Sequence, residues 1–210
     1  MLLIGTPHHA SAQSEPEGRT LPPIAPVPET DPEAEPEERI APLPRDATAE
    51  ARAAHLDLLF ERLADSDNPR WERVQQQIWA TWNRSGSDSM DFLSQRADKA
   101  MEAKNYDAAK SFLNDLVRLA PDYAEGWNKR ATLYFILDDY GRSLDDIART
   151  LKLEPRHFGA LSGLGIILDR LGDKPGALEA YRRAIKIHPN LPGAADGIKK
   201  LTKEVEGHKL

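Results

Sequence analysis

The chain has 210 residues, of which 40% are hydrophobic and 30% are charged, and its formal net charge is −6. This length allows one compact domain with extra segments or one elongated domain. The sequence contains no cysteine, which excludes disulfides, thiolate metal ligands and a cysteine nucleophile. It also contains no run of 18 apolar residues, so we expect no membrane insertion of the mature chain.

The N-terminal residues carry the features of an export signal. Residues 1–5 form a short apolar run, and Ala10-Ser11-Ala12 has the small-x-small form of a signal-peptidase site. A basic stretch and a full apolar region are lacking ahead of it. We interpret residues 1–12 as the remnant of a signal peptide whose beginning lies upstream of Met1, which predicts a periplasmic protein. The alternative is an ordinary N-terminus on a cytoplasmic protein.

Acidic residues and prolines are concentrated in the next segment. Residues 1–50 hold ten acidic and three basic side chains, whereas the remainder holds 24 and 25. Ten of the sixteen prolines lie between Pro7 and Pro44. Such a segment buries too little apolar surface to offset its conformational entropy, so we interpret 13–46 as a disordered linker. The near-neutral remainder lacks the basic excess of a nucleic-acid-binding protein.

The rest of the chain repeats with a fixed period. Pro121, Pro155 and Pro189 are each separated by 34 residues and divide the chain into three units. The units are residues 90–123, 124–157 and 158–191. Each unit contains two stretches of helical periodicity separated by a polar turn. Small residues recur at the eighth and twentieth positions, where two antiparallel helices can approach closely, and the proline ends the second helix.

These units resemble the tetratricopeptide repeat, a helix–turn–helix motif of 34 residues. The matching residues are Ala97, Ala109, Leu113 and Pro121 in the first unit, Trp127, Ala131, Tyr134 and Pro155 in the second, and Leu161, Leu164, Gly165, Ala177, Tyr181, Ala184 and Pro189 in the third. The resemblance implies an all-α fold, a right-handed α-α superhelix of about three repeats. It also implies a module that binds proteins or peptides and is not an enzyme.

Two flanking segments complete the predicted architecture. Residues 47–86 contain two amphipathic stretches, and we interpret them as a degenerate helical pair that caps the first repeat. Trp71, Trp79 and Trp82 lie on the apolar side of the second stretch, which favours a role in the core over a stacking platform for bases. Residues 192–205 are predicted to form a C-terminal capping helix.

The sequence shows no constellation of residues for catalysis, a cofactor or a metal ion. Its six histidines include no pair with the spacing of metal ligands on one helix. Gly163 and Gly165 fall inside a repeat helix, where small residues serve packing rather than phosphate binding. We therefore expect no cofactor, no metal and no nucleic-acid partner.

The resemblance also implies which side chains line a concave peptide-binding groove. They are Asp91, Asp98, Met101, Tyr123, Glu125, Asn128, Thr132, Phe135, His157, Ser162, Ile166 and Asp169. The four acidic residues among them favour a basic partner. The clamp that binds C-terminal carboxylates in some family members is not matched. Ser94, Asp98, Gly159 and Gly163 stand where it requires Lys, Asn and Arg.

These features together predict an assembly adaptor or scaffold for envelope proteins. A cytoplasmic adaptor is the first alternative. The second is a structural protein that self-associates through its repeat ends and has no peptide ligand.

Overall fold

The computed structural model describes residues 40, 41, 43, 44 and 46–207. The predicted signal-peptide remnant and nearly all of the predicted linker lie outside this range. Across the described residues the secondary structure is entirely helical. The helices are α1 (Ala49–Leu63), α2 (Trp71–Trp82), α3 (Asp88–Glu102), α4 (Tyr106–Leu119), α5 (Ala124–Ile136), α6 (Tyr140–Leu153), α7 (Phe158–Arg170), α8 (Lys174–Ile187) and α9 (Ala194–Gly207).

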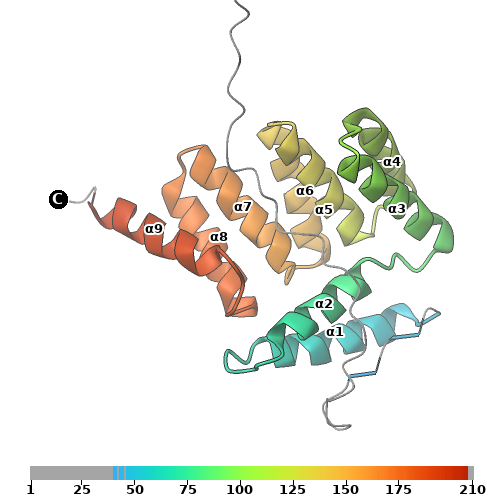
Figure 1. Cartoon of the computed structure of the whole chain (residues 1–210), viewed down its shortest axis with the longest axis horizontal. Coiled ribbons are helices and arrows are strands. Elements are labelled where there is room, and N and C mark those ends of the chain that lie inside the picture. Colours follow the sequence, from blue (N-terminus) through green and yellow to red (C-terminus); the bar gives the residue numbers. More distant parts are fainter. Residues whose placement is uncertain (1–39, 42, 45, 208–210) are drawn as a thin grey trace, which may run out of the picture.

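Helices α3 to α8 form three antiparallel pairs that stack side by side, and α9 packs on the last pair (Figure 1). Each pair coincides with one of the predicted 34-residue units. The predicted all-α repeat architecture is thereby confirmed. Helix α9 contributes Leu201 and Ala194 to a cluster with α8, as expected of a helix that covers the end of the stack.

The turn inside each repeat is built in the same way three times. The residue before the N-cap of the second helix has left-handed backbone geometry. These residues are Lys104, Asp138 and Gly172, with φ of 55°, 57° and 85°. The next residue caps the helix by accepting a hydrogen bond from a backbone N–H. The caps are Asn105, Asp139 and Asp173, at 3.2, 3.1 and 3.0 Å.

Small residues hold the two helices of a repeat close together. Ala131 and Ser143 are both buried, and the Ser143 hydroxyl donates to the Ala131 carbonyl oxygen at 2.8 Å. In the third repeat, a Cβ added at Gly165 would lie 2.9 Å from the Tyr181 ring. The eighth and twentieth positions are therefore crossing points at which larger side chains do not fit.

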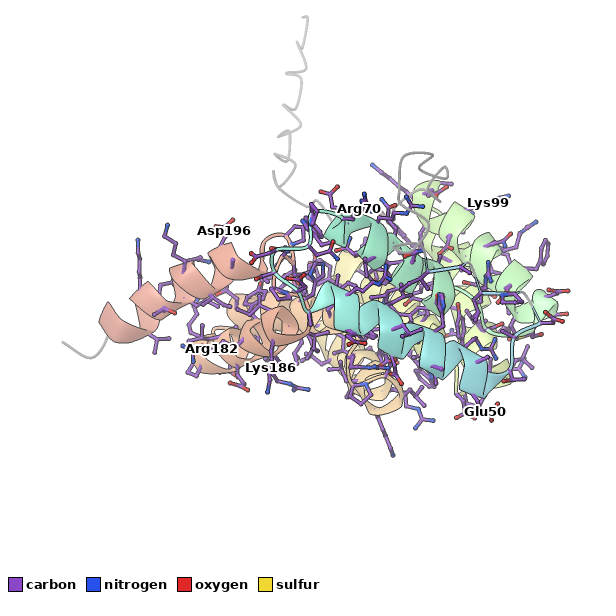
Figure 2. The ribbon with its side chains drawn as sticks, turned by 90° about the horizontal axis from the view of Figure 1, so that it is seen from below. Glu50, Arg70, Lys99, Arg182, Lys186 and Asp196 are labelled. Carbon is purple, nitrogen blue, oxygen red and sulfur yellow. The ribbon has the colours of Figure 1, made fainter. Side chains whose placement is uncertain are left out.

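The first two helices, α1 and α2, form an N-terminal hairpin that packs differently from the repeats. The sequence predicted that this pair caps the first repeat. In the structure it crosses the edge of the stack below α5 and α7 (Figure 1). Seen from that side, it lies between α8 and α9 on one flank and α3 and α4 on the other (Figure 2). Its core is continuous with Phe158 of α7 and with Ile187 and Leu191.

The outer face of the first repeat explains why the hairpin does not stack there. At the tenth position of the unit, Leu133 and Ile167 are buried against the preceding repeat. The first repeat carries Lys99 at this position, and Lys99 is exposed. Burying an unpaired ammonium group is costly, so this face stays open. Gly86, with φ of 88°, lies in the linker that leads from the hairpin to α3.

Candidate functional site

A row of half-buried side chains runs along two neighbouring helices, α5 and α7. We call it the predicted binding face, and it consists of Asn128, Thr132 and Phe135 on α5 and Ser162, Ile166 and Asp169 on α7. Within each helix the residues are spaced by four and three positions, which places them on one side. This row comprises half of the side chains predicted to line the groove.

The polar side chains of this face keep free hydrogen-bonding capacity. The Asn128 amide nitrogen donates to the Glu125 carboxylate at 3.2 Å. The Asn128 side-chain oxygen accepts no hydrogen bond from any residue between 46 and 207. Thr132 donates to the Asn128 carbonyl oxygen at 3.0 Å. An amide held in place by one bond and open at its oxygen can pair with the backbone N–H of a bound segment.

Phe135 provides the apolar part of the same face. The Arg170 guanidinium lies over its ring at 4.7 Å, and the Tyr140 ring lies 6.0 Å away. Arg170 also donates to the Tyr140 hydroxyl at 3.0 Å. These contacts connect α5, α6 and α7 and restrict the orientation of the Phe135 ring, so it is suited to act as an anchor for a ligand.

The acidic residues predicted to attract a basic partner are already paired within the protein. Asp98 accepts from Lys129 at 2.6 and 2.8 Å, and Lys129 itself is buried. Asp169 pairs with Lys174 and, at 3.0 Å, with Lys200. Internal cations thus neutralise these two carboxylates. The electrostatic argument for a basic partner therefore rests on the other two carboxylates, Asp91 and Glu125.

Two further side chains predicted to line the groove, Asp91 and Met101, make local contacts within or next to the first repeat. Asp91 accepts hydrogen bonds from the Ser85 backbone N–H and hydroxyl at 2.7 and 2.6 Å. It therefore ties the linker after the hairpin to α3. Met101 is half-buried and packs against the core of the first repeat.

Three of the predicted groove residues are buried, so their predicted exposure is wrong. Glu125, Tyr123 and His157 are 4%, 8% and 0% exposed. The His157 ring accepts a hydrogen bond from the Ala160 N–H at Nδ1, at 3.0 Å, and so caps α7. Its Nε2 lies 2.9 Å from the Glu125 carboxylate. These partners fix a neutral ring with the proton on Nε2, which donates to Glu125.

The N-terminal hairpin covers this histidine. The Trp82 ring stacks on His157 with centroids 4.1 Å apart and an interplanar angle of 9°. A Cβ added at Gly159 would lie 2.7 Å from the Trp79 ring. Helix α2 thus occupies the end of the predicted groove. Periodicity could not reveal this contact, although the three tryptophans on one side of α2 were a signal that this side is covered.

A second buried histidine meets the beginning of α2. His188 is fully buried, its Nε2 lies 2.7 Å from the Gln75 side-chain oxygen, and its ring lies 5.3 Å from that of Trp71. Burial lowers the pKa of His188 from its ordinary 6.5 to about 4. The neutral ring is favoured because a buried charge would lose its hydration.

The buried neutral His188 makes stability depend on pH. The folded protein binds this proton less readily than the unfolded chain does. The contribution of His188 to stability is therefore fully present above about pH 6.5 and is lost as the pH falls toward 4. We expect the free energy of unfolding to fall by about 2 kcal/mol from this group between pH 7 and pH 5. Urea titrations at several pH values measure it. His188→Gln should show a smaller pH dependence, and equal slopes for the two proteins would contradict this assignment.

The described residues offer no site for a metal ion: no three His, Asp or Glu side chains between 46 and 207 are grouped to hold one. Across the same part of the chain, no helix is long and apolar enough to cross a membrane.

The fold and the binding face define a helical-repeat protein whose exposed chemistry suits binding of other proteins. A family model described as tetratricopeptide repeat matches residues 128–192. A TPR repeat-containing protein of Rhizobium etli is 41% identical over 155 residues, which cover 73% of this chain and 76% of that protein. The chain belongs to the tetratricopeptide repeat family, and it is a protein-interaction module.

More distant similarities extend across organisms. The small glutamine-rich tetratricopeptide repeat-containing protein 2 of Mycosarcoma maydis is 29% identical over 98 residues, which cover 47% of this chain and 28% of that protein. Among solved structures, the Sgt2 TPR domain from Aspergillus fumigatus has a TM-score of 0.55 at 22% identity and covers 59% of this chain and 83% of its own. MamA has a TM-score of 0.53 at 21% identity, with 68% and 85% covered. At these identities the structures show the fold alone.

Proposed function

We propose that the protein is an adaptor of the cell envelope that binds a segment of a partner protein along α5 and α7. The observation that carries this proposal is the predicted binding face. It combines an amide with an open oxygen, Asn128, and an aromatic ring held by its neighbours, Phe135. Polar groups that pair with a peptide backbone and an anchored aromatic ring are the usual elements of segment recognition.

Comparison with a solved structure of the same fold leads us away from one kind of ligand, a peptide bound through its carboxylate terminus. The first TPR of Spaghetti (RPAP3) was solved with an HSP90 peptide, and its structure has a TM-score of 0.54 to this chain at 20% identity. We do not propose the same ligand here. Asp98 is paired with Lys129, and Gly159 lies against Trp79. A carboxylate terminus would find no free cation at Asp98, because Lys129 is already paired there, and it would find the surface at Gly159 covered by Trp79.

Affinity capture with the full chain tests the binding face. We expect Asn128→Ala/Phe135→Ala to weaken capture of the partner by tenfold or more, because anchor residues contribute about 2 kcal/mol or more each. Lys152→Ala is the matched control, since Lys152 is exposed on α6, and it should capture the partner as the wild type does. Capture that survives the double variant and is lost with Lys152→Ala would place binding on the opposite surface.

The envelope location has its own test. If the protein is exported as proposed, N-terminal sequencing of the native protein should begin at Gln13. An intact Met1 or Leu2 would instead assign the adaptor to the cytoplasm and leave the binding face unaffected.

A further inference from the structure

Helix α2 packs on the surface of the repeats through one of its sides, as an amphipathic helix packs in the groove of a receptor. The residues of α2 that meet the repeats are Trp71, Gln75, Trp79 and Trp82, spaced by four, four and three positions on one side of the helix. They meet the turn after α6 through His157 and the turn after α8 through His188. This is the arrangement of an amphipathic helix that lies across a receptor surface.

Polar interactions also join the hairpin to the repeats at two further places. Arg156 pairs with Asp57 of α1 at 2.6 Å, and its guanidinium lies 4.3 Å from the Phe60 ring. Asn190 donates to the Ser66 carbonyl oxygen at 2.9 Å. A contact that mixes ion pairs, amides and aromatic rings resembles interfaces that separate more than it resembles a permanent core.

Two buried polar atoms at this contact have no partner among the described residues. They are Nε1 of Trp82 and Nδ1 of His188. An unpaired buried polar atom weakens an interaction relative to one that is fully satisfied. The hairpin is therefore bound with imperfect complementarity, which leaves room for a better ligand.

The hairpin can also leave as a unit. Its two helices share their own apolar contacts, to which α1 contributes Leu59 and Leu63 and α2 contributes Val74 and Ile78. A non-helical linker, residues 83–87, joins the hairpin to α3. The repeats have apolar clusters of their own, although Phe158 of α7 belongs to the cluster of the hairpin. Release of the hairpin therefore need not disrupt the helix pairs that form the stack.

We propose that α2 is an internal ligand of this surface, and that a partner protein displaces it with an amphipathic helix carrying aromatic residues at the spacing of Trp71, Trp79 and Trp82. The inference rests on the proposed function and names the kind of segment that the partner presents. Displacement uncovers His157 and Gly159 and extends the surface open to the partner beyond the predicted binding face.

A synthetic peptide of residues 68–84 tests this on the full wild-type chain. Hydrogen–deuterium exchange is measured with and without saturating peptide. We expect the α2 amides of the chain to exchange at least tenfold faster with peptide, while those of α5 and α6 are unchanged. The same peptide with alanine at the positions of Trp79 and Trp82 should have no effect. Unchanged exchange of α2 with the native peptide would overturn the proposal.

A second measurement uses a chain whose own α2 is weakened. Trp79→Ala/Trp82→Ala should bind the labelled native peptide at least tenfold more tightly than the wild type does. Adding Gly159→Val should abolish this gain, because its side chain fills the place of the Trp79 ring. Equal peptide affinity of the wild type and the double variant would also overturn the proposal.

The two proposals fail in different ways. Asn128 is linked through Glu125 to His157 under α2, whereas Phe135 lies against Arg170 and Tyr140. Displacement by the peptide should therefore persist in the single variant Phe135→Ala. Displacement without any effect of this variant on partner capture contradicts only the proposed binding face. Capture that depends on Asn128 and Phe135, with no displacement of α2 by the peptide, contradicts only the internal ligand.

Discussion

Phe158→Ala should destabilise the hairpin and its junction with the repeats by about 3–5 kcal/mol, because it removes a buried ring and leaves a cavity. Phe158 is 1% exposed. Its ring lies 5.2 Å from Trp82, 5.1 Å from His188 and 6.5 Å from Phe60. One side chain therefore joins α1, α2, α7 and the turn after α8.

Urea titrations followed by tryptophan fluorescence measure this effect, since three of the four tryptophans lie in α2. Phe92→Ala is the matched control. Phe92 is 62% exposed on α3, so its removal should change stability by no more than about 0.5 kcal/mol. Similar losses in the free energy of unfolding for the two variants would show that Phe158 does not hold the hairpin on the repeats.

Ala131→Leu should also be strongly destabilising, for the opposite reason. Ala131 is 3% exposed, packs with Ile147 and Ile167, and accepts the Ser143 hydrogen bond through its carbonyl oxygen. Three extra carbon atoms at this crossing must push α5 and α6 apart, which costs about 1–3 kcal/mol or more.

Thermal melting followed by circular dichroism at about 222 nm, the helix band, measures it, with a fall of about 2–4 °C expected for each kcal/mol. Ala148→Leu is the control, because Ala148 is exposed on α6 and leucine is a good helix former. A wild-type melting temperature for Ala131→Leu would mean that the eighth position is not a crossing point.

The repeats could be predicted from the sequence because their signals are local. The spacing of Pro121, Pro155 and Pro189 defines the units, and the turn and cap residues lie within a few positions of each other. Each helix pair is close in sequence and packs mainly on itself and its neighbours. Propensity, periodicity and turn chemistry therefore all favour the same structure.

The contacts that modify the groove could not be predicted because they join distant residues. Asp98 and its partner Lys129 are 31 positions apart, and His188 and Gln75 are 113 apart. The sequence shows four acidic side chains near the groove but not the cations and amides that satisfy them. It also shows an apolar side on α2 without showing which surface covers it, since periodicity identifies a buried face and not its neighbour.

The lysine at the open face of the first repeat has a consequence for assembly. Lys99 is exposed at one end of the stack, and Lys199 and Lys203 are exposed on α9 at the other. Two copies placed end to end would bring ammonium groups together and bury at least one of them, which opposes growth into a fibre. Ammonium groups at both ends of the stack therefore disfavour end-to-end association of copies through these two faces.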